Sequence, residues 1–238
     1  MAPVAAYKQQ ELSPPLQSGG RHDFTATIPS QSRAKSDFGA MRVLDVVVAL
    51  AILIFTLPLF LVLTMAIKLS DGGPAIFRHT RIGRNGKPFP CLKFRSMVVD
   101  ADARLNALLA SDPAARLEWE KDQKLRCDPR ITRLGAFLRK SSLDELPQLF
   151  NVLSGEMSIV GPRPIVQAEI VRYGRAFRHY CMVRPGITGL WQVSGRNNTT
   201  YRRRVALDRL YARSKCLSLD AMILIKTIPA VLMRDGSY

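Results

Sequence analysis

The sequence has few of the side chains that bind zinc or form structural disulfides. Its four cysteines are widely separated and form no C-x-x-C pair, which argues against a zinc ribbon or a disulfide framework. The three histidines are isolated from one another along the chain, so they indicate no zinc site either. We therefore expect reduced thiols in a cytoplasmic domain.

Acidic residues are also scarce. The 238 residues include 19 acidic and 35 lysine or arginine side chains, which gives a formal net charge of +16. Such an excess of positive charge fits three kinds of partner: nucleic acid, anionic lipid headgroups and phosphorylated substrates. The chain has no internal repeat, and its length is enough for one sizeable domain with a tail.

Long apolar runs are absent except for one, Val43 to Ile67, which contains a single charge, Asp45, and a proline, Pro58. Its length reaches the roughly 20 residues that a helix needs to cross a bilayer. A buried core helix is a weaker interpretation, because the run has no polar face for water. We therefore expect a membrane segment.

Basic residues lie on both sides of this run, with Arg42 before it and Lys68 after it. Positive flanks prefer the cytoplasmic side of a membrane, so a straight span would leave one basic flank outside. A re-entrant helix that is broken at Pro58 and enters and leaves on one face keeps both flanks inside. A kinked spanning helix stays an alternative, but we favour the re-entrant one.

These features divide the chain into three parts. Residues 1–40 are rich in proline, serine, glycine and glutamine and predict a disordered tail. Residues 41–68 form the membrane-anchoring re-entrant helix, and residues 69–238 form a cytoplasmic catalytic domain. The expected fold is α+β and mostly helical, with the membrane helix joined to a domain of short helices.

Two local patterns add detail to this fold. Asn85-Gly86 lies between two short apolar stretches, which predicts a small β-hairpin. An apolar helix over residues 219–233 either packs in the core or lies in the membrane interface, and we favour the core. Trp191 to Val193 is expected to form a short strand, and residues 184–189 a loop.

Two adjacent acids, Asp144 and Glu145, stand out in this basic chain. One interpretation is structural, because Ser142-x-x-Glu145 fits a capping box. The other starts the helix at Asp144, which places Pro147 in the first turn, where its missing N–H costs little. In both cases the carboxylates lie at a positive helix end, which favours the ionised form that can attack phosphorus or bind Mg²⁺.

Several cations lie in constrained backbone, between prolines or beside glycine, or in short motifs near the acids. An arginine on a solvated surface does not need rigid backbone. An arginine that binds phosphate through two hydrogen bonds benefits from it. For any one of them a surface charge is the simpler interpretation, but together they favour a phosphate-rich substrate. The residues are Lys93, Arg95, Arg139, Arg163, Arg184 and Arg196.

Five motifs in this order resemble those of the bacterial sugar transferase family, the monotopic polyprenyl-phosphate phosphoglycosyl transferases. The resemblance covers roughly residues 38–238. The motifs occupy residues 93–97, 142–148, 151–158, 160–164 and 183–189.

The resemblance implies a two-step reaction at a membrane. An aspartate attacks the β-phosphate of a UDP-sugar and releases UMP, and undecaprenyl phosphate then takes the sugar phosphate from the enzyme. Carried onto this chain, Asp144 would be the nucleophile and the Mg²⁺ ligand, with Glu145 as its partner. The donor would be UDP-galactose or UDP-glucose, in the first membrane step of exopolysaccharide biosynthesis, on the cytoplasmic face of the bacterial inner membrane.

The resemblance also implies roles for residues outside the acid pair. Arg139 and Arg163 match positions that hold phosphate. A second group matches the nucleotide end of the site. A third group matches the start of the re-entrant helix and its break. The residues of the nucleotide end are Arg184, Gln192 and Arg196, and those of the helix are Arg42, Asp45 and Pro58.

Two other functions stay open at this stage. A membrane-tethered binder of anionic lipid or nucleic acid could use the basic segment from Arg196 to Lys215, although stacking on bases would need more aromatics than Tyr201 and Tyr211. A scaffold for an export complex would use the acids only as a helix cap. We favour the enzyme, with inner-membrane lipids as partners, no nucleic acid, and a homo-oligomer left open.

Overall fold

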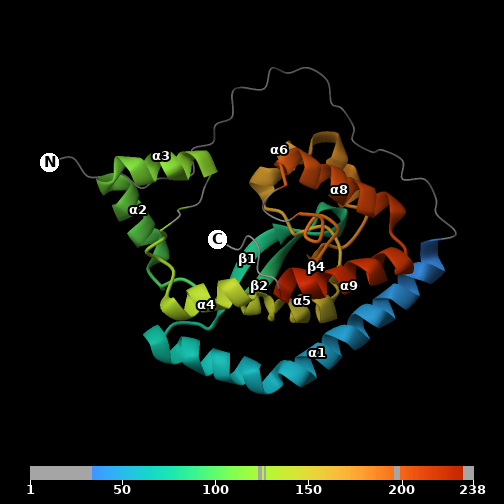
Figure 1. The fold of residues 1–238 in the computed structure, drawn as a ribbon, viewed down its shortest axis with the longest axis horizontal. Coiled ribbons are helices and arrows are strands. Elements are labelled where there is room, and N and C mark those ends of the chain that lie inside the picture. Colours follow the sequence, from blue (N-terminus) through green and yellow to red (C-terminus); the bar gives the residue numbers. More distant parts are fainter. Residues whose placement is uncertain (1–33, 123–124, 126, 196–198, 233–238) are drawn as a thin grey trace.

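The fold is a long apolar helix with a small domain of short helices and strands lying along it (Figure 1). The computed structural model describes residues 34–122, 125, 127–195 and 199–232. The expectation of a disordered tail falls largely on residues 1–33, which lie outside the described residues. Residues 34–40 are helical, so the first helix, α1 (Ala34–Asp71), extends beyond the expected bounds of 41–68 at both ends.

Helix α1 is continuous through Pro58, so the expected break in the helix at this residue is not found. Figure 1 instead shows α1 bent in its middle part. A proline removes one backbone hydrogen bond and crowds the preceding turn, which bends a helix without having to end it. Spanning 38 residues, α1 is about 57 Å long along its path at about 1.5 Å per residue.

Both halves of α1 pack on the domain. In the first half, the Asp45 carboxylate accepts hydrogen bonds from the Ser158 hydroxyl and the Ile159 amide, each at 2.9 Å. In the second half, Leu63 and Ile67 pack in a buried cluster with Phe94. The helix therefore follows the surface of the domain instead of leaving it at one end.

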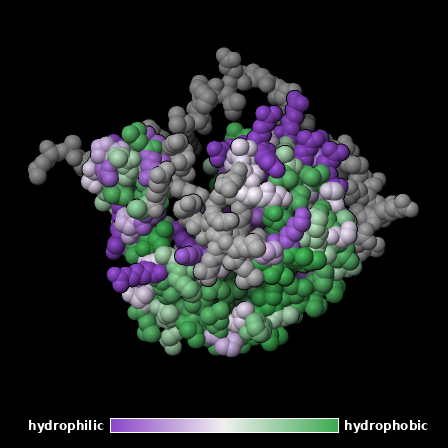
Figure 2. Space-filling view, viewed as in Figure 1, coloured by the Kyte–Doolittle hydropathy of each residue, from purple (hydrophilic) through white to green (hydrophobic). Residues whose placement is uncertain are grey.

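The outer side of α1 is apolar and exposed. Only 11% of its most apolar window is buried, and it is the one described helix long and apolar enough to cross a membrane. Figure 2 shows apolar side chains along this lower face, over α1. This exposure excludes the interpretation of the run as a buried core helix. Exposed side chains include Val47, Ile54, Phe55, Leu57, Leu61, Val62 and Met65.

The centre of the domain is the expected hairpin. Strands β1 (Ile76–Ile82) and β2 (Pro88–Phe94) pair antiparallel. A short 3-10 turn, η1 (Arg84–Gly86), joins them, and Asn85 adopts the left-handed conformation at φ 60°. Asparagine tolerates this conformation better than most residues, so the Asn-Gly signal is confirmed.

A second, parallel pair of strands was not expected. Strand β3 (Ser158–Val160) pairs with β4 (Gly186–Thr188), which lies within a segment predicted to be a loop. The strand expected at residues 191–193 is wrong, because these residues form turns. The pairing brings Gly161 so close to Gly186 that a Cβ on either would meet backbone atoms of the other or its neighbours, so both positions require glycine.

The rest of the domain is helical, with a pair of helices to one side and two longer helices to the other (Figure 1). The side pair breaks at Asp112-Pro113, since proline favours the start of a new helix. The α-helices are α2 (Ala101–Ser111), α3 (Pro113–Asp122), α4 (Arg133–Ser141), α5 (Gln148–Ser154), α6 (Ile170–Tyr173), α7 (Phe177–Tyr180), α8 (Tyr201–Ser214) and α9 (Leu217–Leu232). The further 3-10 turns are η2 (Leu143–Glu145), η3 (Gln167–Glu169) and η4 (Gly174–Ala176).

Helix α9 packs in the core, as favoured, and it also has an exposed apolar side. Ile223 is fully buried in the main core cluster, together with Ala49 of α1 and Val152 of α5. Ile225 and Ile228 are 69% and 63% exposed. One face of α9 therefore packs in the core, and the other adds to the exposed apolar side chains.

Replacing Asp45 should weaken the docking of the first half of α1. Asp45→Ala removes two hydrogen bonds to a charged acceptor, and we expect the free energy of unfolding in detergent to fall by about 2 kcal/mol. Asp45→Asn keeps an acceptor oxygen and should lose less. Equal stability of Asp45→Ala and the parent protein in denaturant titrations would show that these bonds do not fasten the helix.

Candidate active site

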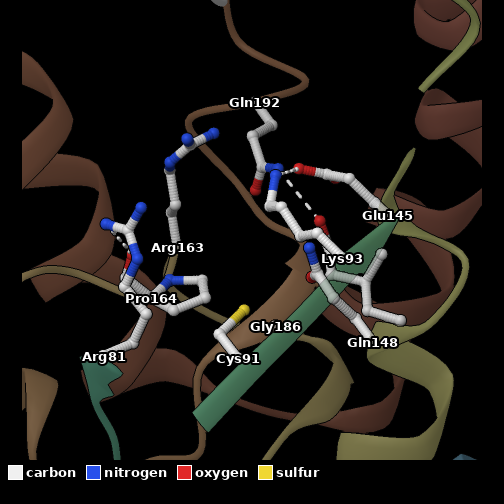
Figure 3. Close-up of a pocket in the computed structure, with 10 residues that line it drawn as sticks. Arg81, Cys91, Lys93, Glu145, Gln148, Arg163, Pro164, Gly186 and Gln192 are labelled. Carbon is white, nitrogen blue, oxygen red and sulfur yellow. Dashed lines mark hydrogen bonds and ion pairs between the residues drawn. The ribbon is translucent and has the colours of Figure 1, made fainter. Parts of the chain in front are cut away.

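A pocket opens beside β2, at the point where the two strand pairs and the start of α5 meet. Lys93 and Cys91 come from β2 and Arg81 from the end of β1. Figure 3 shows Lys93, Glu145 and Gln148 on one side of this pocket and Arg81 and Arg163 on the other. The remaining described lining residues are Pro164, Gly186, Ile187 and Gln192.

The acid pair lies in η2, between α4 and α5. Ser142 ends α4 in the left-handed conformation, at φ 58°, and its side chain makes no capping hydrogen bond. The capping-box interpretation is therefore wrong. Helix α5 begins at Gln148, with Pro147 as the residue before it, so the helix also starts later than Asp144. The tight turn holds both acids next to β2.

Lys93 bridges the two carboxylates. Its ammonium nitrogen lies 2.6 Å from Glu145 Oε1 and 3.5 Å from Asp144 Oδ2. The exposed fractions of the acid side chains are 13% for Asp144 and 25% for Glu145, so the three charges are largely shielded from water. A single cation shared by two acids leaves this group with a net negative charge.

The two acids differ in their proton affinity. Burial raises the pKa of Asp144 above its ordinary value, against the opposing effect of Lys93. Burial also acts to raise the pKa of Glu145, but Lys93 and Arg163 outweigh it and hold that pKa below its ordinary value. Glu145 is thus the firmly ionised member of the pair, and Asp144 depends on the cations around it.

An amide side chain fixes the strand that carries Lys93. Asn151 of α5 is 2% exposed, and its oxygen accepts a hydrogen bond from the Leu92 amide at 2.9 Å. Its nitrogen donates to the Pro90 carbonyl at 2.8 Å and to Glu156 at 2.6 Å. Because Leu92 and Pro90 flank Cys91, the bonds lock the register of β2 against α5 and set the position of Lys93.

The structure brings together four of the predicted phosphate-binding residues. Lys93, Arg163 and Gln192 line the pocket. Arg139 donates from Nε to the Ser96 hydroxyl at 2.8 Å, and it lies close enough to Asp144 for their charges to interact. Asp144 itself is not among the residues that line the pocket, although it contacts the same ammonium as Glu145.

Two other predicted phosphate-binding residues lie elsewhere. Arg95 forms an ion pair with Asp71 at the end of α1, and Arg184 donates from Nε to the Gly155 carbonyl at 2.8 Å, after the end of α5. Neither lines the pocket, so their role in phosphate binding stays a prediction. Arg196 lies outside the described residues.

Arg42 and Asp45, which the resemblance assigns to the start of the membrane anchor, both fasten α1 to the domain. Arg42 Nη2 donates to the Leu153 carbonyl at 3.1 Å, in the last turn of α5. A cation at a helix C-terminus satisfies carbonyls that lack partners and opposes the negative end of the helix dipole. The two residues thus join α1 to α5 and to β3.

The sequence interpretation missed Arg81. The signal was available once the hairpin was predicted, because side chains of paired strands alternate between two faces. In the observed register Arg81 lies opposite Phe89, and His79 lies opposite Cys91. Arg81, Cys91 and Lys93 therefore share one face of the hairpin, the face that lines the pocket.

The acid pair could hold a divalent cation only together with a ligand. Among the described residues, no group of three or more histidine, cysteine or acidic side chains converges. Mg²⁺ is often held by one or two carboxylates, with substrate phosphates and water supplying its other oxygens. Asp144 and Glu145 fit that donor set when a diphosphate lies in the pocket.

Comparison with known proteins identifies the family. The sequence profile described as Bacterial sugar transferase matches residues 36–234. An uncharacterized sugar transferase of Haemophilus influenzae is 60% identical over 198 residues, which are 83% of this chain and 42% of that protein. The undecaprenyl-phosphate galactose phosphotransferase of Salmonella typhimurium is 56% identical over 197 residues, 83% of this chain and 41% of that protein.

A third relative has nearly the same extent as this chain. The exopolysaccharide production protein ExoY of Sinorhizobium fredii is 49% identical over 213 residues, which are 89% of this chain and 94% of that protein. The chain spans about two fifths of the length of the first two relatives. With a profile match over most of its length, the chain belongs to the bacterial sugar transferase family.

Proposed function

We propose that this protein transfers a sugar-1-phosphate from a UDP-sugar to undecaprenyl phosphate. The donor is UDP-galactose or UDP-glucose, since the names of relatives include both a galactose phosphotransferase and a UDP-glucose:undecaprenyl-phosphate glucose-1-phosphate transferase. The reaction is the first membrane step of exopolysaccharide biosynthesis, on the cytoplasmic face of the bacterial inner membrane. The product would be an undecaprenyl-diphosphate sugar.

One observation carries this proposal: the leucines that flank the acid pair pack against the cluster in which α1 buries its second half. Leu143 and Leu146, which flank Asp144 and Glu145, pack against the buried cluster that contains Leu63 and Ile67 of α1. A lipid-linked phosphate keeps its chain in the bilayer and its charge at the interface. Carboxylates at this depth meet such a phosphate with little loss of freedom for either reactant.

The proposed reaction has two displacements at one phosphorus atom. The Asp144 carboxylate forms a bond to the β-phosphorus of the UDP-sugar, and the bond from that phosphorus to the bridging oxygen breaks, so UMP leaves. The phosphate oxygen of undecaprenyl phosphate then attacks the same phosphorus. The bond to Asp144 breaks, which restores the carboxylate and forms the new diphosphate.

The cations of the pocket make the first displacement feasible. A carboxylate and a diphosphate repel each other, so positive charge must offset the repulsion before attack. Lys93 contacts both acids, and Arg163 lies across the pocket. A Mg²⁺ ion held by Asp144, Glu145 and the diphosphate would further neutralise the phosphate oxygens.

The path of α1 supports a re-entrant anchor. Contacts with the domain at both Asp45 and Ile67 place the two ends of the apolar stretch on the same side of the exposed apolar face. A helix that crossed the bilayer would have to part from the domain in one half. The basic flanks of the run then both lie in the cytoplasm.

Replacing the proposed nucleophile should abolish the first displacement. For Asp144→Asn we expect release of UMP from UDP-galactose or UDP-glucose to fall about a thousandfold or more. The parent protein mixed with the donor should gain the mass of a hexose phosphate, and the variant should not. Asp102→Asn, the same change on exposed α2, serves as the control.

Product formation without any adduct on Asp144 would rule out the covalent mechanism. A binder of anionic lipid would instead show no UMP release in the parent protein and equal vesicle binding in both variants.

Removing the bridging cation should move the pH dependence of the reaction. In Lys93→Met the ammonium no longer lowers the pKa of Asp144, so that pKa rises further. The acidic limb of the UMP-release profile should then shift to higher pH by about one unit or more. Activity should recover partly at alkaline pH, which a misfolded variant would not show. Lys87→Met, at an exposed lysine, should keep the parent profile, and an unshifted limb in Lys93→Met would contradict the role of Lys93.

The anchor can be tested without activity. We expect a cysteine introduced in the tail, Ser18→Cys, and one introduced after the apolar stretch, Ser70→Cys, to react with a membrane-impermeant maleimide only in inverted vesicles. Reaction of Ser18→Cys in intact cells would show a spanning helix. That result would leave the catalytic proposal unaffected.

A further inference from the structure

The side of the pocket opposite the acid pair holds a second arginine that the proposed reaction has not used. Arg81 extends from the end of β1 toward the pocket, and Figure 3 shows it on the same side as Arg163, across from Lys93 and Glu145. Its side chain is 16% exposed. Burying a guanidinium is costly unless an anion compensates it, so its surroundings need an explanation.

Few interactions compensate Arg81. Nη1 donates to the Pro164 carbonyl at 3.4 Å and lies 3.8 Å from Glu169 Oε2, and Nη2 contacts His79 Nδ1 at 3.3 Å. None of these is the short bidentate pair that an arginine forms with a dedicated carboxylate. Burial and the charge of Arg163 both lower the pKa of Arg81, which reflects two cations held near each other.

Among the described residues Arg163 has no counterion in direct contact, although its charge helps to lower the pKa of Glu145 across the pocket. Within the described part of the chain it makes no hydrogen bond and no ion pair, although it lines the pocket between Pro162 and Pro164. Two neighbouring guanidiniums, one weakly paired and one unpaired, repel each other. An anion between them would relieve that repulsion, and phosphate oxygens match the planar donor geometry of arginine.

We infer that Arg81 is a substrate-binding residue that holds, together with Arg163, the phosphate of the nucleoside diphosphate that leaves as the monophosphate. This inference rests on the proposed function. The geometry divides the pocket into two sides. Lys93 and the acids take the phosphate that is attacked, and the two arginines take the phosphate that departs. A departing phosphate gains negative charge as its bond breaks, which is where fixed cations accelerate a displacement most.

Glu169 is a positioning residue for Arg81, on the side of Arg81 away from the ligand. Glu169 Oε2 accepts a hydrogen bond from the Val166 amide at 2.9 Å, and Oε1 accepts one from the Tyr201 hydroxyl at 3.3 Å. Its carboxylate also lies 3.8 Å from Arg204, whose guanidinium lies 4.5 Å from the ring centroid of Trp191. Glu169 is therefore held in place and can orient Arg81 without touching the ligand.

Nucleotide binding tests the inference, with UMP and uridine as paired probes in calorimetry on the detergent-solubilised protein. We expect Arg81→Met to reduce the ratio of UMP affinity to uridine affinity at least tenfold and to leave uridine affinity unchanged. Arg81→Lys, which keeps the charge but not the fork of donors, should reduce the ratio less. Arg78→Met, an exposed arginine on the other face of the same strand, should leave the ratio unchanged.

The positioning role has its own readout. Glu169→Gln should reduce the same ratio about threefold, with an unchanged uridine affinity and an unchanged thermal midpoint. A purely structural role would lower the midpoint and weaken both ligands alike, and that result would overturn the assignment of Glu169.

The outcomes separate this inference from the proposed function. A protein that releases UMP and binds it, but whose Arg81→Met and Arg81→Lys variants keep the parent ratio within twofold, would overturn the assignment of Arg81 alone. A parent protein that neither binds UMP nor releases it from any UDP-sugar would overturn both. Loss of uridine binding in Arg81→Met would indicate misfolding, and Arg81→Lys then decides: a reduced ratio supports the assignment and an unchanged ratio overturns it.

Discussion

The site depends on the contact between Asn151 and the backbone of β2. One buried amide satisfies the donor of Leu92 and the acceptor of Pro90, two groups that an isolated hairpin would leave to water. A shift of β2 by one residue would break both bonds and turn Lys93 to the opposite face of the hairpin. Helix α5 begins shortly after the acid pair. Contacts that hold β2 against α5 therefore also hold the Lys93 ammonium near the two carboxylates. Leaving either backbone group buried without a partner would cost more than the bond contributes, which makes the register specific.

The same few elements also set the position of the site relative to the exposed apolar face of α1. Helix α5 packs against α1 on one side and against β2 on the other, and the ring of Phe60 in α1 lies 4.8 Å from that of Phe94 and 5.7 Å from that of Phe150. The acid pair is thus connected to the apolar surface through a rigid aromatic contact and not through a flexible linker. In a helix that followed a straight path, the contacts at Asp45 and at Ile67 could not both form. The bend in α1 and the position of the carboxylates relative to its exposed apolar face are consequences of one packing arrangement.

Much of this could be predicted from the sequence, and the failures have physical causes. The local signal at Asn85-Gly86 was reliable, because it predicted the hairpin that the structure shows. Strands β3 and β4 were missed because each has three residues and pairs with a distant partner, so neither shows a period of its own. The ion pair of Arg95 was not foreseen because its partner, Asp71, lies outside its motif. Arg81 was missed because its importance comes from the face it shares with Lys93 and not from its neighbours in the chain.

The choice of cations on the two sides of the pocket follows from what each side has to do. Lys93 is a point charge on a flexible stem, and it can lean from Glu145 toward an incoming phosphate without losing a planar arrangement of donors. Arg81 and Arg163 are planar, and they are held by strand pairing and by two prolines, so they favour one orientation of an anion. Burial makes Asp144 the acid that is harder to ionise, while Lys93 and Arg139 stabilise its ionised form. A carboxylate of higher pKa is the stronger nucleophile once it is ionised. In the proposed reaction, a flexible charge beside the nucleophile and rigid charges around the departing phosphate would together lower the barrier to the first displacement.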